Sequence, residues 1–349
     1  MSDQALRVGI IGDGFMQPSF FEKALRQRLP ETAMDIRSLY LDWPLRLVTT
    51  KKDPALPVAE FLGRPEDYFD FCADREVLVV HLAPVVAATM ERAPSLRVIA
   101  VSRGGPVNVE VKAARERGIT VINTPGRNAS AVAEFTVGSL LAETRNIVRG
   151  HLSVRDGSFR RDFYHHDHAG RELCELTVGI VGFGDIGSRV ARLLVPFGCR
   201  ILVADPYREL TAEEQALGIR KVPLDDLIAS ADVITLHPKV TPETQKMIGP
   251  REIARMKKGA YIVNTTRGQV LDYDGLYAGL TSGQLAGAAL DTFDPEPPKP
   301  DSPLLRLPNV TLSPHIAGAS IYSITKAANM LADDIARILA RTAPLHGAR

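Results

Sequence analysis

The chain has 349 residues, of which 45% are hydrophobic and 24% are charged, and this balance is ordinary for a globular protein. Its 42 basic and 41 acidic residues give a formal net charge of +1, which excludes a general attraction to nucleic acid or to an acidic membrane surface. At roughly 150 residues per domain, the length predicts two domains.

Short apolar runs rich in β-branched residues alternate with helical patterns along the chain. The first series of predicted strands comprises Arg7–Ile11, Ile36–Leu41, Val77–Leu82, Arg97–Val101 and Thr120–Ile122. The second series comprises Thr177–Val181, Arg200–Ala204, Val233–Leu236, Ala260–Asn264, Gly287–Leu290 and Val310–Leu312. Because these runs are continuously apolar rather than alternating, they indicate parallel strands covered on both faces. The predicted fold class is therefore α/β, with two doubly wound parallel sheets built from βαβ units.

A long helix is predicted between the two series, over Ala131–Val148, with Asn128 or Ser130 as its N-cap. Few helix-breaking residues interrupt this segment, so we expect one continuous helix. The predicted boundary therefore places the first domain before it, up to Thr124, and the second domain over residues 125–319.

The last predicted helix, Ile321–Leu339, has no local partner with which to pack. It could return to the first domain, which would then be discontinuous and comprise residues 1–124 plus 320–349. The final segment, Thr342–Arg349, is predicted to be a frayed tail.

The three cysteines, Cys72, Cys174 and Cys199, are odd in number and fit no metal-binding spacing. They favour reduced thiols in a cytoplasmic protein. We find no signal peptide pattern. The longest apolar stretch, Val77–Met90, is short and is interrupted by His81, so no membrane span is expected.

A glycine-rich turn follows the strand Thr177–Val181, in the segment Gly182-Phe-Gly184-Asp-Ile-Gly187. The first glycine permits a tight turn, the second lets the backbone approach a diphosphate, and the third lets the next helix pack against the strand. The predicted helix, Ser188–Val195, presents free N–H groups and a favourable dipole to an anion at its N-terminus. The segment therefore predicts a dinucleotide site.

Asp205 ends the next predicted strand, 18 residues after Gly187, where an acidic side chain binds the ribose hydroxyls of a dinucleotide. A carboxylate there also repels a 2′-phosphate, so we expect NAD rather than NADP. Arg208, three residues later, keeps NADP possible. The alternative is a glycine turn with a purely structural role, followed by an Asp that binds no ribose. The preceding strand, the spacing of the glycines and the position of Asp205 together weigh against this alternative.

A similar but incomplete pattern, Gly9-Ile-Ile-Gly12-Asp-Gly14, follows the first predicted strand. Gln17 and Pro18 stand where the third glycine and the helix of a dinucleotide site should be. We therefore expect a second sheet of similar topology that binds no dinucleotide. The loop Asp13–Ser19 could still contact a substrate.

Three residues that suit acid–base chemistry or anion binding follow strands of the second series. Arg267, Glu296 and His315 come after its fourth, fifth and sixth strands, respectively. Because ligands of open α/β sheets bind beyond the carboxyl ends of the strands, we expect all three near the edge that carries the glycine turn.

The chemistry of these three residues fits hydride transfer at a 2-hydroxy acid. Arg267 offers a planar, bidentate cation for a carboxylate. His315 is suited to exchange the hydroxyl proton near neutral pH, and Glu296 can orient the imidazole and favour its protonated form. Taken singly, each has an ordinary alternative, namely a salt bridge, a solvated acid or a buried histidine. Their joint placement favours a catalytic role.

The sequence resembles the D-isomer-specific 2-hydroxyacid dehydrogenases over almost the whole chain. The motifs that carry the resemblance are Asn123–Asn128 with Val132–Glu134, Gly179–Gly187, Asn264–Gly268, Leu290–Pro297 and Ser313–Gly318. The resemblance implies two Rossmann-like domains with an active-site cleft between them, NAD as cofactor and a small D-2-hydroxy or 2-keto acid as substrate. It also implies a homodimer built partly by the long helix after Gly126.

The resemblance further implies roles for individual residues. Arg267 would bind the substrate carboxylate, His315 would be the acid/base, and Glu296 would orient it. The implied cofactor-binding residues are Gly182, Gly184, Asp185, Ile186, Gly187, Asp205, Pro238, Thr265, Asp291 and Gly318. Among them, Asp291 would hold the nicotinamide carboxamide.

A glycine-rich loop of the first domain, Val101–Asn108, matches a loop that in this family offers N–H groups to the substrate carboxylate. Gly104 and Gly105 would supply them here. Arg103 departs from the family pattern because it replaces a small residue. Its guanidinium could recognise a second anionic or hydroxylated group of the substrate, and a solvent-facing arginine is the alternative.

A histidine-rich loop invites a metal interpretation, since His165, His166 and His168 flank Asp167. Several arginines share this loop, and a solvated surface loop is the favoured interpretation. We therefore predict no metal site.

A protein that senses NAD(H) is the alternative to an enzyme. Corepressors of this fold keep the same cleft residues and act by binding partners. Such proteins carry additional partner-binding sequence at their termini, and this chain has little of it. The sequence therefore favours the enzyme.

Overall fold

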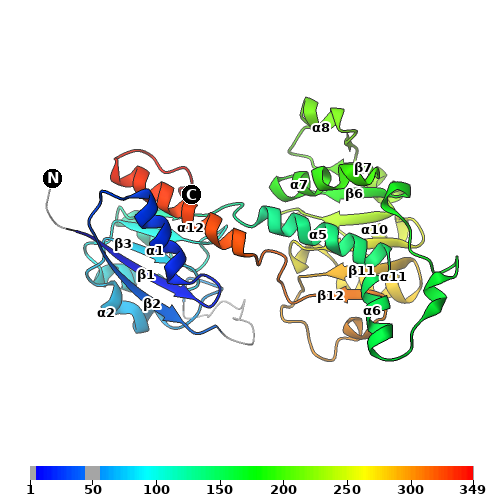
Figure 1. Ribbon diagram of the computed structural model, residues 1–349, viewed down its shortest axis with the longest axis horizontal. Coiled ribbons are helices and arrows are strands. Elements are labelled where there is room, and N and C mark those ends of the chain that lie inside the picture. Colours follow the sequence, from blue (N-terminus) through cyan, green and yellow to red (C-terminus); the bar gives the residue numbers. More distant parts are fainter. Residues whose placement is uncertain (1–4, 44–55, 349) are drawn as a thin grey trace. The chain divides into compact units, whose positions relative to one another are not determined.

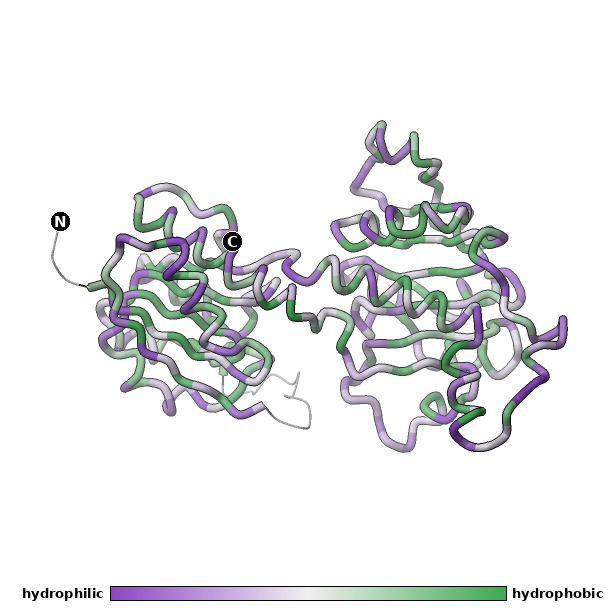
Figure 2. The backbone as a smooth tube through the Cα atoms, viewed as in Figure 1, coloured by the Kyte–Doolittle hydropathy of each residue, from purple (hydrophilic) through white to green (hydrophobic). Residues whose placement is uncertain are grey.

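The structure is a computed structural model that describes residues 5–43 and 56–348. The chain divides into two compact units, one formed by residues 1–127 with 320–349 and the other by residues 128–319 (Figure 1). The first segment thus extends to Arg127, whereas the sequence suggested Thr124. Within each unit the hydrophobic residues concentrate along the strands of a sheet that helices cover (Figure 2).

In the described residues, the first unit contains a five-stranded parallel sheet in the order β2-β1-β3-β4-β5. Its strands are β1 (Leu6–Asp13), β2 (Met34–Leu41), β3 (Val77–Val80), β4 (Val98–Val101) and β5 (Thr120–Asn123). The chain places β2 on one side of β1 and β3 on the other. The topological switch point, where ligands of such sheets bind, therefore lies between β1 and β3.

Helices cover both faces of this sheet. On one face, α1 (Pro18–Arg28) packs against α12 (Ile321–Leu339) over a core that includes Val8 and Ile10 (Figure 1). On the other face lie α2 (Phe69–Cys72), α3 (Ala87–Arg92) and α4 (Val111–Glu116). The sequence suggested that Pro18 takes the place of a helix, and this was wrong. Proline needs no N–H partner in the first turn, so α1 begins at Pro18 itself.

The segment after α12 is held to the first unit. The buried Asp334 carboxylate accepts hydrogen bonds from the backbone N–H of Leu345 at 2.6 Å and from the N–H and Nδ1 of His346 at 3.1 and 2.8 Å. Gly347 also pairs with Ile122 of β5. The prediction of a frayed tail was therefore wrong up to residue 348, and residue 349 lies outside the described residues.

The second unit contains, in its described residues, a seven-stranded parallel sheet in the order β12-β11-β10-β9-β6-β7-β8. Its strands are β6 (Thr177–Val181), β7 (Arg200–Ala204), β8 (Arg220–Lys221), β9 (Val233–Leu236), β10 (Ala260–Asn264), β11 (Leu285–Leu290) and β12 (Val310–Leu312). Strand β8 was not predicted, because its two polar residues carry no periodic pattern. The switch point of this sheet lies between β6 and β9.

Helices α5 (Ala129–Thr144) and α7 (Asp185–Leu194) pack on one face of the second sheet. On the other face lie α9 (Leu224–Ser230), α10 (Pro250–Arg255) and α11 (Tyr273–Thr281), and α8 (Ala212–Ala216) precedes β8. Short 3₁₀ turns occur at η1 (Pro65–Tyr68), η2 (Arg161–Tyr164), η3 (Leu173–Glu175), η4 (Val195–Phe197), η5 (Gly268–Val270) and η6 (Pro303–Arg306). None of the helices in the described ranges has both the length and the apolar character needed to span a bilayer.

The long helix predicted between the two series is broken in the structure. Helix α5 ends at Thr144, and α6 (Ile147–Arg155) begins after Asn146, whose φ of +54° is left-handed. Asparagine tolerates this conformation better than most residues. Its side chain stabilises the break, because Nδ2 donates to the carbonyl of His168 at 2.9 Å and Oδ1 accepts from Arg149 at 2.6 Å. At the other end, Asn128 is the N-cap residue of α5, but its side chain accepts no capping bond.

Candidate active site

The glycine-rich turn of the second unit adopts the geometry that a dinucleotide requires. Gly182 has a φ of +85°, and a Cβ there would lie 2.6 Å from the backbone nitrogen of Pro238. A Cβ on Gly187 would lie 2.2 Å from the carbonyl oxygen of Gly182, so this glycine lets α7 approach β6. A Cβ on Gly184 would meet nothing within 4 Å, which leaves the backbone open to a ligand.

The helix after this turn begins earlier than the sequence suggested. Gly184 is the N-cap of α7, so Asp185 and Ile186 lie in its first turn, where backbone N–H groups have no partner within the helix. The exposed Asp185 carboxylate pairs with Arg189 at 2.8 Å, one turn away. The backbone, rather than the Asp185 side chain, is therefore the part of this turn that suits a diphosphate.

Asp205 lies at the end of β7 and connects it to the glycine turn. Its Oδ2 accepts from the N–H of Phe183 at 2.7 Å, and its Oδ1 accepts from the N–H of Tyr207 at 2.8 Å. Arg208 donates to the buried Glu214 at 2.6 Å and to the carbonyl of Phe183 at 2.5 Å. The Arg208 guanidinium, which kept NADP possible in the sequence, is therefore engaged within the protein.

Other residues expected to contact the nucleotide have partners within the second unit. The hydroxyl of Thr265 lies 2.8 Å from that of Thr136 on α5, and the carbonyl of Pro238 accepts from Thr266 at 3.2 Å. A Cβ on Gly318 would lie 2.4 Å from the side-chain amide of Asn128, so this glycine lies close to that side chain. Thr265 and Gly318 thus contact α5 and its N-cap residue.

His237, which was not predicted as a site residue, follows β9 beside this turn. Its Nε2 lies 3.0 Å from the Thr235 hydroxyl, and burial lowers its pKa to about 3. A histidine directly after an apolar strand that lies next to the glycine turn was the signal that could have identified it.

His315 and Glu296 form the hydrogen-bonded pair that the sequence predicted. His315 Nδ1 lies 2.6 Å from Glu296 Oε1. The Glu296 side chain is 11% exposed and that of His315 is 40% exposed, so the carboxylate is sheltered while the imidazole is accessible to solvent. Because Nδ1 is engaged by the carboxylate, Nε2 is the ring nitrogen available for proton transfer.

The backbone of His315 is left-handed, with a φ of +56°. A non-glycine residue in this region costs on the order of 1–2 kcal/mol, and such residues concentrate at functional sites. Asp291 stabilises the loop around it. The buried Asp291 carboxylate accepts from the Ser313 hydroxyl at 2.6 Å and from the N–H groups of Ile316 and Ala317 at 2.9 and 2.8 Å. Asp291, expected to hold the nicotinamide, thus also holds the His315 loop.

Arg267 is exposed at the end of β10, where the Asn264 amide donates to its backbone carbonyl at 3.0 Å. Its own Nη1 donates to the carbonyl of Thr266 at 2.8 Å. The next residue, Gly268, packs so closely on the segment after β11 that a Cβ would lie 2.0 Å from the Phe293 carbonyl. Since β10, β11 and β12 are parallel neighbours, Arg267, Glu296 and His315 leave the sheet at the same edge.

The glycine loop of the first unit follows β4. The Asn123 amide donates to the carbonyl of Gly104 at 2.7 Å, and the Thr124 N–H donates to that of Arg103 at 2.8 Å. A Cβ on Gly104 or Gly105 would meet nothing within 4 Å, so their backbone is open. Arg103 Nη1 donates to the carbonyl of Glu60 at 2.7 Å, and its Nη2 also pairs with the Glu60 carboxylate.

The histidine-rich loop brings possible ligand atoms of His165, His166 and Asp167 within 4.8 Å of one another. All three residues are exposed. Exposed polar clusters of this kind commonly hold no ion, so the loop gives no support for a metal role.

Comparison with known proteins agrees with this fold. Residues 137–317 match the family model described as "D-isomer specific 2-hydroxyacid dehydrogenase, NAD binding domain". A glyoxylate reductase of Korarchaeum cryptofilum is 42% identical over 252 residues, which are 72% of this chain and 76% of that protein. A D-3-phosphoglycerate dehydrogenase of Methanocaldococcus jannaschii is 40% identical over 277 residues, 78% of this chain, and the chain spans about half of that longer protein, 52%.

A solved structure from Thermus thermophilus superimposes with a TM-score of 0.78 at 30% identity, covering 99% of this chain and 100% of that one. The two parallel α/β sheets and the glycine turn are those of a Rossmann-like, nucleotide-binding protein. The chain belongs to the D-isomer specific 2-hydroxyacid dehydrogenase family, and it is an NAD-dependent enzyme of that class.

Proposed function

We propose that this enzyme interconverts a small 2-keto acid and the corresponding D-2-hydroxy acid, with His315 as the acid/base. The single observation that carries the proposal is the 2.6 Å contact between His315 Nδ1 and Glu296 Oε1, at the strand edge that also carries Arg267. This arrangement combines a proton carrier, a carboxylate that orients it and a cation for the substrate.

Each residue has a distinct task in the proposed reaction. The Arg267 guanidinium binds the substrate carboxylate in a bidentate manner. In the first unit, the open N–H groups of Gly104 and Gly105 are further candidates for carboxylate binding. In the reducing direction, His315 Nε2 gives its proton to the keto oxygen, and in the oxidising direction it takes the hydroxyl proton. Glu296 holds the ring orientation and stabilises the imidazolium.

NAD, when bound, accepts the hydride from the hydroxyl-bearing carbon or returns it. The residues present fit it, because Gly182 and Gly187 allow the tight turn and the close approach of α7 to β6, and Gly184 leaves the backbone open to a diphosphate. Asp205 repels a 2′-phosphate, and the Arg208 guanidinium, a cation that could bind one, is engaged by Glu214. We therefore infer a preference for NAD over NADP.

The remaining cofactor contacts are proposed on the same basis. The free N–H groups of Asp185 and Ile186 bind the diphosphate, and Pro238 lies against the nucleotide. Thr265 and Gly318 shape the backbone around the site. Asp291 contacts the nicotinamide carboxamide in addition to holding the His315 loop.

The test is the change in NADH absorbance with a panel of 2-keto acids that includes glyoxylate and hydroxypyruvate. We expect turnover by the wild-type protein and a loss of roughly 100-fold or more in kcat for His315→Gln. For Arg267→Ala we expect kcat/KM to fall by a similar factor. The matched control is His346→Gln, since His346 also pairs with a carboxylate, Asp334, at 2.8 Å. Near-normal turnover by His315→Gln would refute the site assignment.

The same panel separates the enzyme from an NAD(H)-sensing binding protein. An absence of turnover with every keto acid, together with tight NADH binding, would favour the sensor.

We also propose that the enzyme is a homodimer that uses α6 and the loop after it. In α6 the buried residue is Ser153, whereas its neighbours Leu152 and Val154 are 55% and 61% exposed. Phe159 and Tyr164, 65% and 88% exposed, extend this apolar surface along the loop. Apolar side chains that are exposed beside a buried serine indicate a surface that another molecule covers.

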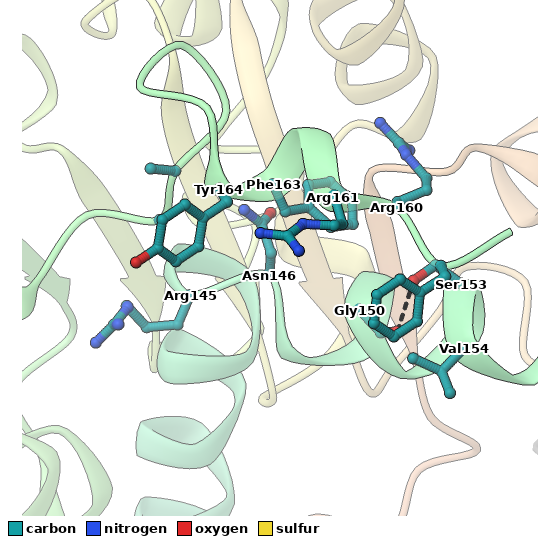
Figure 3. Close-up of a pocket in the computed structure, with 12 residues that line it drawn as sticks. Arg145, Asn146, Gly150, Ser153, Val154, Arg160, Arg161, Phe163 and Tyr164 are labelled. Atoms are coloured by element: carbon teal, nitrogen blue, oxygen red, sulfur yellow. Dashed lines mark hydrogen bonds between the residues drawn. The ribbon is translucent and has the colours of Figure 1, made fainter.

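A hollow of about 640 Å³ lies beside this surface (Figure 3). Its lining includes Arg145, Ser153, Val154, Phe159, Phe163 and Tyr164. Symmetric dimers are the commonest assemblies, so a second copy of the chain is the proposed occupant. In analytical ultracentrifugation, Leu152→Asp with Val154→Asp should sediment as a monomer, whereas the exposed control Leu217→Asp should not. A monomeric wild-type protein would refute the dimer.

A further inference from the structure

Two cysteines of the second unit lie at the amino ends of neighbouring strands, β6 and β7 (Figure 1). Cys174 belongs to the 3₁₀ turn η3 just before β6, and Cys199 directly precedes β7. The Arg200 N–H, at the start of β7, donates to the carbonyl of Leu176 at 3.0 Å. Because neighbouring strands lie about 4.8 Å apart, the segments that carry the two cysteines enter the sheet side by side.

Gly198, the residue before Cys199, shows how closely these segments approach each other. Its φ of +71° is left-handed, which glycine adopts at no steric cost. A Cβ placed on Gly198 would lie 3.8 Å from the Cβ of Cys174. Disulfides join cysteines whose Cβ atoms are about 3.5–4.5 Å apart. Since Gly198 has no side chain and Cys199 is the next residue, a local adjustment of this turn brings the two sulfurs within bonding reach.

The electrostatics of Cys199 are a second sign that the two thiols are close. Burial raises the pKa of the Cys199 thiol to about 11, and the negative charge of a Cys174 thiolate contributes to this rise. A charge has such an effect only on a group near it. The pair is therefore supported both by the geometry of the turn and by the interaction of the two thiols.

The two thiols differ in exposure, and neither is firmly held. Cys174 is exposed, whereas Cys199 is half-buried. The Cys174 Sγ donates to a carboxylate oxygen of Glu172 at 3.8 Å, and the Cys199 Sγ donates to the carbonyl of Leu194 at 3.7 Å. Thiols are weak donors, so both sulfurs are able to turn. An oxidant from solvent therefore meets Cys174 first, with Cys199 as a sheltered second thiol behind it.

We propose that Cys174 and Cys199 are a modification site, a thiol pair that hydrogen peroxide converts reversibly into a disulfide. The Cys174 sulfur attacks a peroxide oxygen, so an S–O bond forms, the O–O bond breaks and one water leaves. The Cys199 sulfur then attacks the Cys174 sulfur, so the S–S bond forms, the S–O bond breaks and a second water leaves. The two thiols together lose two electrons and two protons, and the peroxide gains them. A thiol reductant reverses the change by exchange.

The disulfide would close a loop around the first βα unit of the second sheet. Strand β6, the turn Gly182–Gly187 and helix α7 all lie between the two cysteines in the sequence. Closing this loop restricts the unfolded chain, so the oxidised protein should be more stable. The bond lies at the amino ends of the strands, whereas the glycine turn and Asp205 lie at their carboxyl ends. We therefore expect oxidation to leave NADH binding nearly unchanged.

The experiment exposes the full chain to a small excess of hydrogen peroxide, blocks the remaining thiols by alkylation and maps the tryptic peptides by mass spectrometry. Trypsin separates the two cysteines, because Cys174 falls in residues 172–189 and Cys199 in residues 193–200. We expect these two peptides to be joined in the oxidised wild-type protein and released by dithiothreitol. Cys174→Ser should give no such product, and its exposed position makes it unlikely to disturb folding.

Cys72→Ser is the matched control, since Cys72 is a buried thiol of the first unit. It should form the joined peptide as the wild type does. The inference is overturned if the oxidised wild-type protein carries Cys174 only as a sulfinic acid, or linked to Cys174 of a second chain. It is also overturned if neither cysteine is modified.

The melting temperature provides a second measurement. Oxidation should raise it by roughly 5–10 °C in the wild type and in Cys72→Ser, and dithiothreitol should reverse the rise. An equal rise in Cys174→Ser would contradict the inference, because the effect could not then come from this bond. Neither measurement uses a keto acid or NADH. The inference thus goes beyond the proposed function, and either can fail while the other stands.

Discussion

Asp291 is a buried carboxylate that holds the loop of the proposed acid/base, His315. It accepts three hydrogen bonds from residues 313–317, between which the left-handed His315 is held. Asp291→Asn replaces one acceptor by an amide that faces N–H or O–H donors. We expect the free energy of unfolding to fall by about 1–3 kcal/mol and kcat to fall with it, because the loop loosens.

The control for this prediction is Asp232→Asn. Asp232 also accepts a backbone bond, from Thr177 at 2.8 Å, and it pairs with Arg171 and Lys257, but it lies at the start of the strands. It should lose stability in urea unfolding while kcat stays close to that of the wild type. If both variants lose kcat equally, Asp291 has no special role in positioning His315.

His237 gives a pH dependence of stability whose sign follows from its burial. Burial lowers its pKa from 6.5 to about 3, so the folded protein keeps the ring neutral while the unfolded chain protonates it below pH 6.5. The unfolded state then binds more protons, and stability decreases as the pH falls from 6.5 towards 3. At pH 5 this loss amounts to about 2 kcal/mol relative to pH 8.

His237→Asn should remove that part of the pH dependence, whatever it does to stability at pH 8. Urea unfolding at both pH values measures it for the wild type, for His237→Asn and for the exposed control His165→Asn. An unchanged difference between the two pH values in His237→Asn would show that this ring does not remain neutral in the folded protein.

At the scale of elements, strands were easier to predict than the ends and breaks of helices. Strands such as β6 and β10 are apolar on both faces, so their bounds follow from the sequence (Thr177–Val181 and Ala260–Asn264). The break at Asn146 depends on hydrogen bonds to Arg149 and to the carbonyl of His168, 22 residues away, and no local pattern reveals the latter. The position of the helix break is therefore determined by hydrogen bonds to residues elsewhere in the fold, because local helix propensity does not determine it.

The C-terminal segment is the clearest case of this dependence on tertiary partners, and it yields a prediction. Asp334 lies on α12 with its side chain 0% exposed, and its acceptors are satisfied by Leu345 and His346. Removing residues 343–349 would leave this carboxylate unpaired. We expect the deletion to lower the free energy of unfolding by about 1–3 kcal/mol.

Asp334→Asn should have an effect of similar size, and the two changes together should be less than additive, since they remove the same bonds. Thermal and urea unfolding of the four proteins of this double-mutant cycle measure the coupling. Full additivity would mean that the tail and Asp334 stabilise the fold independently.

At the scale of the whole molecule, the part of the candidate site that lies at the carboxyl ends of parallel strands could be predicted from the sequence. Arg267, Glu296 and His315 follow three strands that are neighbours in one sheet, and parallel strands deliver their ends to one edge. The proximity of Cys174 and Cys199 was not predicted. It depends on the pairing of β6 with β7 and on the turn at Gly198, and the spacing of the cysteines in the sequence reveals neither.

Each unit has its own hydrophobic cores, so the molecule should not unfold in a single transition. The first unit buries residues such as Val8 and Ile99, and the second buries its own set, including Ile180 and Ile262. The chain's one tryptophan, Trp43, lies in the first unit, against Phe15. Its fluorescence therefore reports the first unit, whereas far-ultraviolet circular dichroism reports both.

NADH binds, in the proposed function, through the glycine turn of the second unit. At a concentration 100 times its Kd, it should stabilise that unit by about 2.7 kcal/mol. We expect urea unfolding followed by circular dichroism to shift to higher urea with NADH, while the Trp43 transition shifts less. Coincident transitions from both probes, with and without NADH, would mean that the two units unfold as one, and that the cofactor's binding energy is shared by the whole chain.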